Sequence, residues 1–241
     1  MKKECIQYYE QEARRYDSRR FSCTCGKMVD RTFKQAVYDH LRSSQLVLDA
    51  GTGTGRFAIF LAAKGKRVVA VDSSQNMLHV ARDKAVGSGV QDNIAFVQAD
   101  VQQLPFSNAV FDGICSIHVL VHFDSLDEAI SEYSRVIKLK DGVIVFDLSH
   151  ASIIKVYSLL ERLRSSTPFS FPNYYHGLST IRELLSKNGV QITAVRHIKK
   201  IPRPILHLLI CRLGFSWLVP LYRTVEQLNF GVLRIIKAKR L

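Results

Sequence analysis

The sequence predicts a doubly wound α/β fold built on a seven-stranded sheet. Short apolar runs alternate along the chain with stretches whose large apolar residues recur at helical spacing, and this alternation is typical of βα units that share a parallel sheet. The chain has 241 residues, of which 47% are hydrophobic, so it is long enough for one sizeable core. We therefore expect a single domain.

The first two thirds of the chain supply the five strands that we expect to be parallel. They are residues 46–50, 67–71, 94–98, 110–117 and 142–147. Helices are expected at 56–64, 75–86 and 126–137, the second with Ser73 or Ser74 as its N-cap. The run 142–147 is almost wholly apolar, which indicates a strand buried on both faces.

The last third of the chain is patterned less regularly. A helix is expected at 179–187, ended by Asn188-Gly189, and residues 190–198 and 231–239 are the expected sixth and seventh strands. His207, Arg212 and Pro220 interrupt the apolar stretch 203–228, so we expect packed helices and no transmembrane segment, while peripheral membrane contact stays open.

Charge and cysteine content limit the classes of function. The formal net charge is +13, and a positive field attracts nucleic acid, anionic membranes or acidic metabolites. Five cysteines without a framework spacing favour a reducing compartment, and Cys23-Thr24-Cys25 lacks the spacing of a metal site. The first residues carry no apolar signal segment, so we expect a cytoplasmic protein.

A glycine-rich turn, residues 49–55, follows the first strand. Small residues let the backbone approach a ligand, and the following helix N-terminus favours negative charge. The glycines stand at positions 51, 53 and 55, whereas a dinucleotide fingerprint needs its third glycine where Arg56 stands. This spacing disfavours a nicotinamide or flavin cofactor.

Asp72 ends the second strand, 17 residues after Gly55. An acidic side chain at this place can accept hydrogen bonds from both hydroxyls of a ribose. The alternative is an ordinary glycine turn with Asp72 as a helix cap. Together the turn and the carboxylate indicate a cofactor that contains a nucleoside.

Four ordered runs between about residues 45 and 150 resemble a known family. They read VLDAGTGTGRFAIFLAAKG, VVAVDSSQNMLHVAR, FVQADVQQLPF and FDGICSIHVLVHF. Together they are similar to the motifs of class I S-adenosylmethionine-dependent methyltransferases, a group with a Rossmann-like fold, and most similar to the ubiquinone/menaquinone C-methyltransferases. The resemblance implies S-adenosylmethionine as the cofactor.

The resemblance also implies which residues form the cofactor site and how the chain is divided. The methionine part of the cofactor is expected beside three residues of the turn, the ribose at Asp72, the adenine near Met77, and the sulfonium near His118. The chain is expected to divide into an N-terminal helical lid at 1–44, a cofactor-binding core at 45–150 and a substrate cap with C-terminal strands at 151–241. Tyr16 is expected to close the pocket as part of the lid. The implied cofactor residues are Tyr16, Asp49, Gly51, Gly53, Asp72, Ser73, Met77, Asp100, Val101 and His118.

Methyl transfer requires a base only when the acceptor must lose a proton. His118, His122 and His176 are the titratable candidates near the expected pocket. A helix-terminal or packing role for His122 and a solvent-facing place for His176 are the alternatives. Cys115 is expected to be a buried small hydrophobe rather than a nucleophile.

The acceptor is less well defined than the cofactor. We expect a small or lipophilic metabolite, methylated on O, N or C. The segment Ser116-Ile117-His118-Val119 lacks the Asp/Asn-Pro-Pro-Tyr/Phe motif of amino-methylating nucleic-acid enzymes, so motifs do not support a nucleic-acid substrate despite the charge. Methylation of RNA or protein, and a non-catalytic cofactor-binding partner subunit, remain the alternatives.

Overall fold

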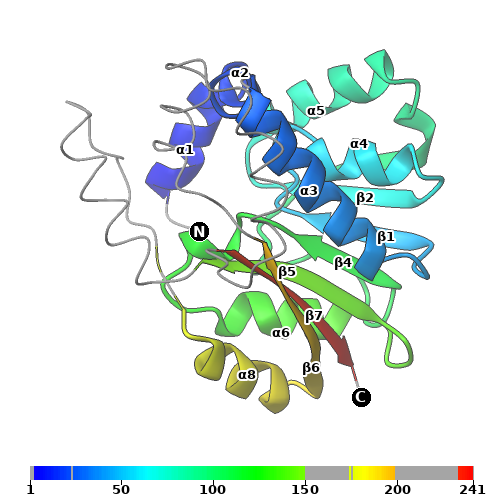
Figure 1. Cartoon of the computed structure of the whole chain (residues 1–241), viewed down its shortest axis with the longest axis vertical. Coiled ribbons are helices and arrows are strands. Elements are labelled where there is room, and N and C mark those ends of the chain that lie inside the picture. Colours follow the sequence, from blue (N-terminus) through cyan, green and yellow to red (C-terminus); the bar gives the residue numbers. More distant parts are fainter. Residues whose placement is uncertain (1–2, 23, 150–173, 175, 199–232, 241) are drawn as a thin grey trace, which may run out of the picture.

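The computed structural model describes residues 3–22, 24–149, 174, 176–198 and 233–240, and it confirms the α/β fold (Figure 1). Its seven strands form one sheet in the order β3-β2-β1-β4-β5-β7-β6. The strands are β1 Leu46–Ala50, β2 Arg67–Asp72, β3 Ile94–Gln98, β4 Gly113–Ser116, β5 Val143–Ser149, β6 Val190–Ile198 and β7 Leu233–Arg240.

The directions of the strands indicate the edge of the sheet at which a ligand would bind. Strands β1 to β5 pair in parallel, and β7 pairs antiparallel with both β5 and β6. The chain order reverses between β1 and β4, which are neighbours in the sheet. In such sheets, ligands bind outside the carboxyl ends of the strands at the point of reversal.

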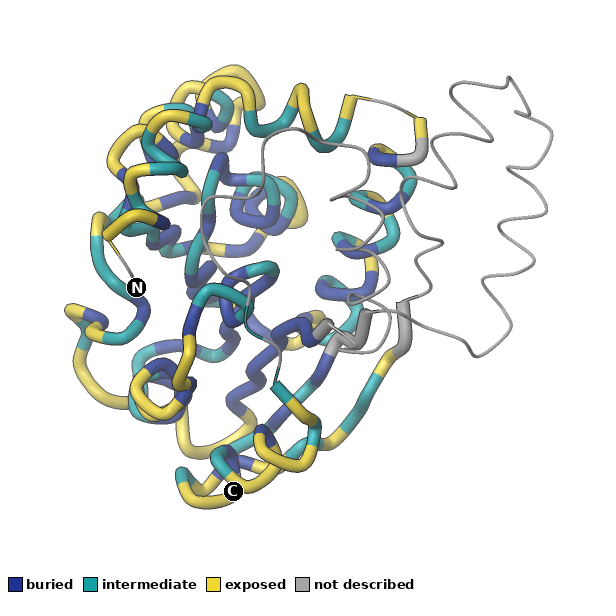
Figure 2. Tube along the Cα trace, turned by 90° about the vertical axis from the view of Figure 1, so that its left-hand side faces the viewer, coloured by how far each residue is buried: buried dark blue, intermediate teal, exposed yellow. Residues whose placement is uncertain are grey.

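Helices cover both faces of the sheet. Apolar side chains of α3 and α4 pack on one face with Val47, and those of α6 and α8 pack on the other face with Leu48. This opposition of neighbouring residues follows from the two-residue period of a strand, and Figure 2 shows the resulting buried interior. The helices are α1 Lys3–Glu12, α2 Tyr16–Phe21, α3 Thr24–His40, α4 Arg56–Ala62, α5 Gln75–Gly87, α6 Asp127–Val136 and α8 Leu178–Lys187, with 3₁₀ turns η1 Gln91–Asn93 and η2 Leu120–His122.

The elements agree with the sequence-based prediction except near β4. The predicted strand at 110–117 is shorter, because the amides of Val110 and Phe111 donate to the carbonyl of Val136 at the end of α6, at 2.8 and 3.0 Å, and not to a neighbouring strand. His122 does not begin a helix; it ends the short turn η2, and α6 starts at Asp127.

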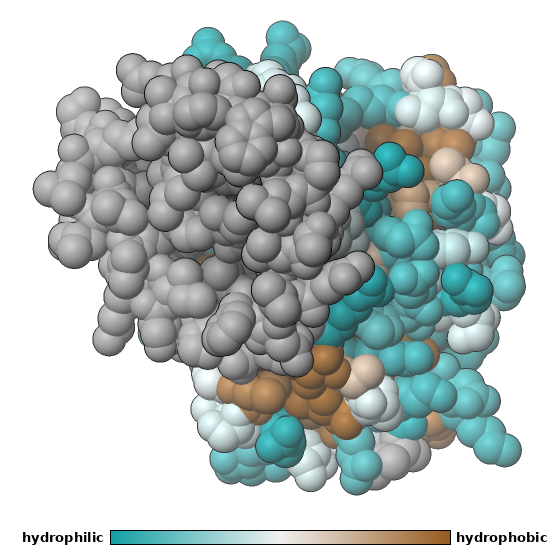
Figure 3. Space-filling model, in the orientation of Figure 1, coloured by the Kyte–Doolittle hydropathy of each residue, from teal (hydrophilic) through white to brown (hydrophobic). Residues whose placement is uncertain are grey.

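Several predicted segments lie outside the described residues, among them the apolar stretch 203–228 and most of the predicted cap. In the part of the chain that the structure describes, no helix is both long enough and apolar enough to cross a membrane. The described surface in Figure 3 is mostly hydrophilic, with separate brown areas. Two exposed large apolar side chains in the described part are Val86 and Leu139.

Gly51, in the turn after β1, is required by both its backbone and its surroundings. Its φ is +77°, and a Cβ there would lie 2.3 Å from Cγ2 of Val119. Valine is stiff about χ1, so its methyl groups cannot easily move away. Gly53 also has a positive φ, of +54°, but a Cβ on it would meet nothing within 4 Å. Gly51 thus serves packing, whereas Gly53 faces open space.

We expect Gly51→Ala to lower the free energy of unfolding by about 2–4 kcal/mol, because left-handed backbone strain and overpacking add. Gly53→Ala is the matched control, and it should cost only the strain, about 1–2 kcal/mol. Urea unfolding of both variants measures the difference. Equal losses would show that the Val119 contact does not constrain the turn.

Candidate functional site

The candidate site is a cavity at the carboxyl ends of β1, β2 and β4, covered by the N-terminal helices. It therefore lies where the topology predicts a ligand. Its lining residues are Tyr9, Tyr16, Gly51, Thr52, Gly53, Thr54, Arg56, Phe57, Asp72, Ser73, Met77, Ala99, Asp100, Val101, Ile117, His118, Val119, His122 and Phe123.

Asp72 joins the two loops that border the cavity. One carboxylate oxygen accepts the backbone amide of Gly53 at 2.8 Å, and the other accepts that of Ser74 at 2.9 Å. Ser74 in turn caps α5 by accepting the amide of Met77 at 3.1 Å. Burial raises the pKa of Asp72 to about 6. The carboxylate is thus fixed in place at the wall of the cavity.

Asp49 lies beneath the turn and does not line the cavity. Its carboxylate is buried and accepts the Thr52 hydroxyl at 2.6 Å and the Ala58 amide at 3.0 Å. Burial raises its pKa to about 6. The structure therefore gives Asp49 the role of holding the glycine turn against α4, behind the ligand surface.

His118 is held in an uncommon conformation beside the cavity. Its φ is +65°, which is rare for a residue with a side chain and is often stored strain at a functional site. Asp147, at the end of β5, accepts its backbone amide at 2.7 Å and its Nδ1 at 2.7 Å. The ring also packs 5.3 Å from that of Phe33, between centroids. Because Nδ1 faces a carboxylate, the basic lone pair of a neutral ring is on Nε2.

His122 pairs with the N-terminal helix α1. A hydrogen bond of 2.9 Å joins its Nε2 to the hydroxyl of Tyr9. Burial lowers the pKa of His122 to about 4 and raises the pKa of Tyr9. Both groups are therefore neutral near pH 7, and they form a polar part of the cavity wall.

The structure brings most of the predicted site residues together. Of those implied by the resemblance, all except Asp49 line the cavity. His122 lines it as well, whereas His176 does not: its Nε2 is hydrogen bonded to the carbonyl of Phe123 at 2.9 Å. These roles in binding and catalysis stay predictions.

Sequence reasoning missed Asp147 and Tyr9. The acid of Asp147 interrupts an otherwise apolar strand end, Val-Ile-Val-Phe-Asp, and an unpaired charge there would be costly, so this signal was available. Tyr9 lies 113 positions from its partner His122, and no local pattern indicates that contact.

Comparison with known proteins gives the site its chemistry. Residues 48–146 match a family model described as a methyltransferase domain. The chain therefore contains a methyltransferase domain and is similar to the class I S-adenosylmethionine-dependent methyltransferases. The matched segment begins in β1 and ends in β5, so it contains the turn, Asp72 and His118.

Curated relatives show the same similarity, and a solved structure shares the fold. The chain is 26% identical to demethylmenaquinone methyltransferase of Bacteroides fragilis over 97% of this chain and 91% of that protein. It is 36% identical to a ubiquinone/menaquinone biosynthesis C-methyltransferase of Pseudomonas paraeruginosa, over 54% of this chain and 50% of that protein. Magnesium protoporphyrin IX methyltransferase of Synechocystis, with bound S-adenosylhomocysteine, has the same fold at 22% identity and a TM-score of 0.60, covering 89% and 82% of the two chains.

The cavity fits S-adenosylmethionine, the cofactor of this methyltransferase. Asp72 offers carboxylate oxygens to a ribose diol. Buried apolar side chains of Met77 and Val101 line the same cavity and suit a flat base. The open space over Gly53 lets a ligand approach the backbone closely.

The raised pKa of Asp72 predicts pH-dependent cofactor binding. The ionised carboxylate accepts two hydroxyl donors, so protonation removes an acceptor and binding must release the proton. With a pKa of about 6, the dissociation constant for S-adenosylhomocysteine should be flat above pH 7 and about tenfold higher at pH 5. Calorimetry across this range measures the change.

Asp72→Asn is the control for this pH dependence. It should bind more weakly at every pH and lose most of the dependence, because an amide does not titrate. An unchanged pH profile in Asp72→Asn would assign the titration to another group, with buried Asp49 the next candidate.

Proposed function

We propose that this methyltransferase acts on a small, lipophilic acceptor that loses a proton during the reaction. The observation that carries the proposal is His118, held by Asp147 in the wall of the cofactor cavity. A base oriented by a carboxylate in this way is the usual arrangement for removing a proton from a reacting group.

The lining of the cavity supports a lipophilic acceptor. Ile117, Val119 and Phe123 lie around His118 in sequence and line the same cavity. The relative from Bacteroides fragilis is named for demethylmenaquinone, a quinone. We therefore infer a hydroxyaromatic ring of the reduced quinone type as the acceptor, methylated on carbon or oxygen.

His118, Asp147 and the apolar wall of the cavity would have distinct roles in the reaction. Bound S-adenosylmethionine would supply an electrophilic methyl group. Nε2 of His118 would take the proton that the acceptor loses, and the Asp147 carboxylate would stabilise the resulting imidazolium. The apolar wall would exclude water from the reacting atoms. Fixed positioning of the acceptor would contribute much of the rate.

The predicted division of the chain belongs to the same proposal. Residues 1–44 would cover the cofactor, residues 45–150 would bind it, and residues 151–241 would complete the acceptor site. We place the reaction in the cytoplasm, where a lipophilic quinol would be reached at the membrane surface.

The test is methylation of a short-chain demethylmenaquinol with radiolabelled S-adenosylmethionine. We expect His118→Gln to lower kcat by about 10²–10⁴-fold through loss of the base. Asp147→Asn should also lower kcat, because the tautomer and orientation of the imidazole are lost. Both changes should lower kcat far more than they weaken the binding of S-adenosylhomocysteine, although His118 lines the cofactor cavity.

His79→Gln is the control, because His79 is exposed on α5 and outside the cavity; its activity should match the parent protein. Full activity in His118→Gln would remove the base from the mechanism. Methyl transfer to RNA or to protein from a cell extract, with none to the quinol, would contradict the acceptor and favour the alternative class.

A further inference from the structure

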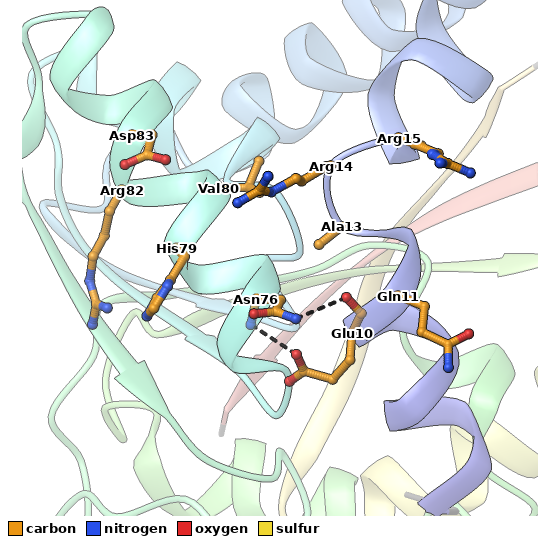
Figure 4. Close-up of a pocket in the computed structure, with 10 residues that line it drawn as sticks. All are labelled: Glu10, Gln11, Ala13, Arg14, Arg15, Asn76, His79, Val80, Arg82 and Asp83. Carbon is orange, nitrogen blue, oxygen red and sulfur yellow. Dashed lines mark hydrogen bonds between the residues drawn. The ribbon is translucent and has the colours of Figure 1, made fainter.

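The helices α1 and α2 belong to the lid predicted at residues 1–44. Each carries an acidic side chain that forms hydrogen bonds with the cofactor-binding elements. Glu10 in α1 accepts the backbone amides of Gln75 and Asn76 at 2.7 and 3.2 Å. The Asn76 side chain also donates to the Glu10 carbonyl at 3.1 Å. Figure 4 shows Glu10 reaching from α1 to the first turn of α5. The Glu10 carboxylate thus accepts hydrogen bonds from free amides at the N-terminus of α5, where the helix dipole is positive.

The second acidic side chain, Asp17 in α2, binds the glycine turn. One of its oxygens accepts the Thr54 hydroxyl at 2.7 Å, and the other forms an ion pair with Lys84 of α5. Lys84 also donates to the Thr54 carbonyl at 3.0 Å. Asp17, Thr54 and Lys84 therefore form one network that joins α2, the turn and α5.

The acidic residues of these two attachments are sequence neighbours of the tyrosines that cover the cavity. Tyr9 precedes Glu10, and Tyr16 precedes Asp17, and both tyrosine rings line the cavity. The rings lie 6.0 Å apart, between centroids. A carboxylate fixed at each position therefore sets where the adjacent ring lies.

We propose that Glu10 and Asp17 are positioning residues, a two-point latch that holds Tyr9 and Tyr16 over bound S-adenosylmethionine and slows its exchange. The inference concerns the cofactor side of the site, and it uses the cavity assignment but not the proposed acceptor.

The latch is suited to opening as well as closing. Asp17 and Lys84 are about one third exposed, and the Glu10 contacts border an open groove between α1 and α5, lined also by Arg14, His79 and Arg82 (Figure 4). Solvent can replace such bonds at low cost. Cofactor held beneath the tyrosines would favour the closed lid, and by linkage a closed lid would favour the cofactor.

The test compares Glu10→Gln/Asp17→Asn with the parent protein. We expect the dissociation constant for S-adenosylhomocysteine to rise about tenfold, which corresponds to about 1.4 kcal/mol. The dissociation rate, measured by stopped flow with excess competitor, should rise by a similar factor. Hydrogen exchange supplies a readout independent of activity: the ligand should protect amides of residues 3–21 in the parent and protect them much less in the double variant.

Glu12→Gln is the matched control, since Glu12 pairs with Arg19 inside the same segment at 2.7 Å and does not line the cavity. It should behave as the parent. Lys84→Gln removes the Asp17 partner from the other side and should also speed dissociation, which keeps the test valid if the double variant is unstable. Thermal unfolding without ligand identifies such instability.

The outcomes separate the latch from the site itself. No binding of S-adenosylhomocysteine by the parent protein would overturn the cofactor cavity. Normal binding by the parent, with unchanged affinity, dissociation and protection in both Glu10→Gln/Asp17→Asn and Lys84→Gln, would overturn the latch alone.

Discussion

The arrangement of the site depends on the two hydrogen bonds that the Asp72 carboxylate accepts from Gly53 and Ser74. They join the glycine turn after β1 to the start of α5 after β2, so one side chain fixes both borders of the cavity. Asp72 also lines the cavity, so we propose that the group that shapes the site is also the group that binds its ligand. Asp72 is buried in this position, and burial raises its pKa to about 6.

Aspartates do the same physical work at three strand ends. Asp49 in β1 accepts the Ala58 amide, Asp72 at the end of β2 accepts two loop amides, and Asp147 in β5 accepts the amide of His118. Charged acceptors bind backbone amides more strongly than neutral ones, and they offset strain such as the positive φ of His118. Two further carboxylates, both partly exposed, attach the N-terminal helices to the cofactor-binding elements.

Much of this could be predicted from sequence because the determining signals are local. Strand β1 and helix α5 follow from an apolar run, a glycine turn and a Ser74 cap, each set within a few residues. The sequence could not distinguish the roles of the two glycines. A side chain at Gly51 would collide with Val119, whereas Gly53 borders empty space. The resemblance implied Asp49 beside the methionine part of the cofactor; in the structure its buried carboxylate accepts the Thr52 hydroxyl and the Ala58 amide and does not line the cavity. Tyr9 depends on a contact across 113 positions, for which local periodicity carries no information.

The central claim is that Asp72 both holds the turn and binds the cofactor. A crystal structure of the protein with S-adenosylhomocysteine tests it most directly. The account predicts ribose hydroxyls within hydrogen-bond distance of Asp72, the homocysteine part over Gly53, and the bonds from Gly53 and Ser74 still in place. A ligand bound elsewhere, or a turn that releases Asp72 when the cofactor binds, would contradict it.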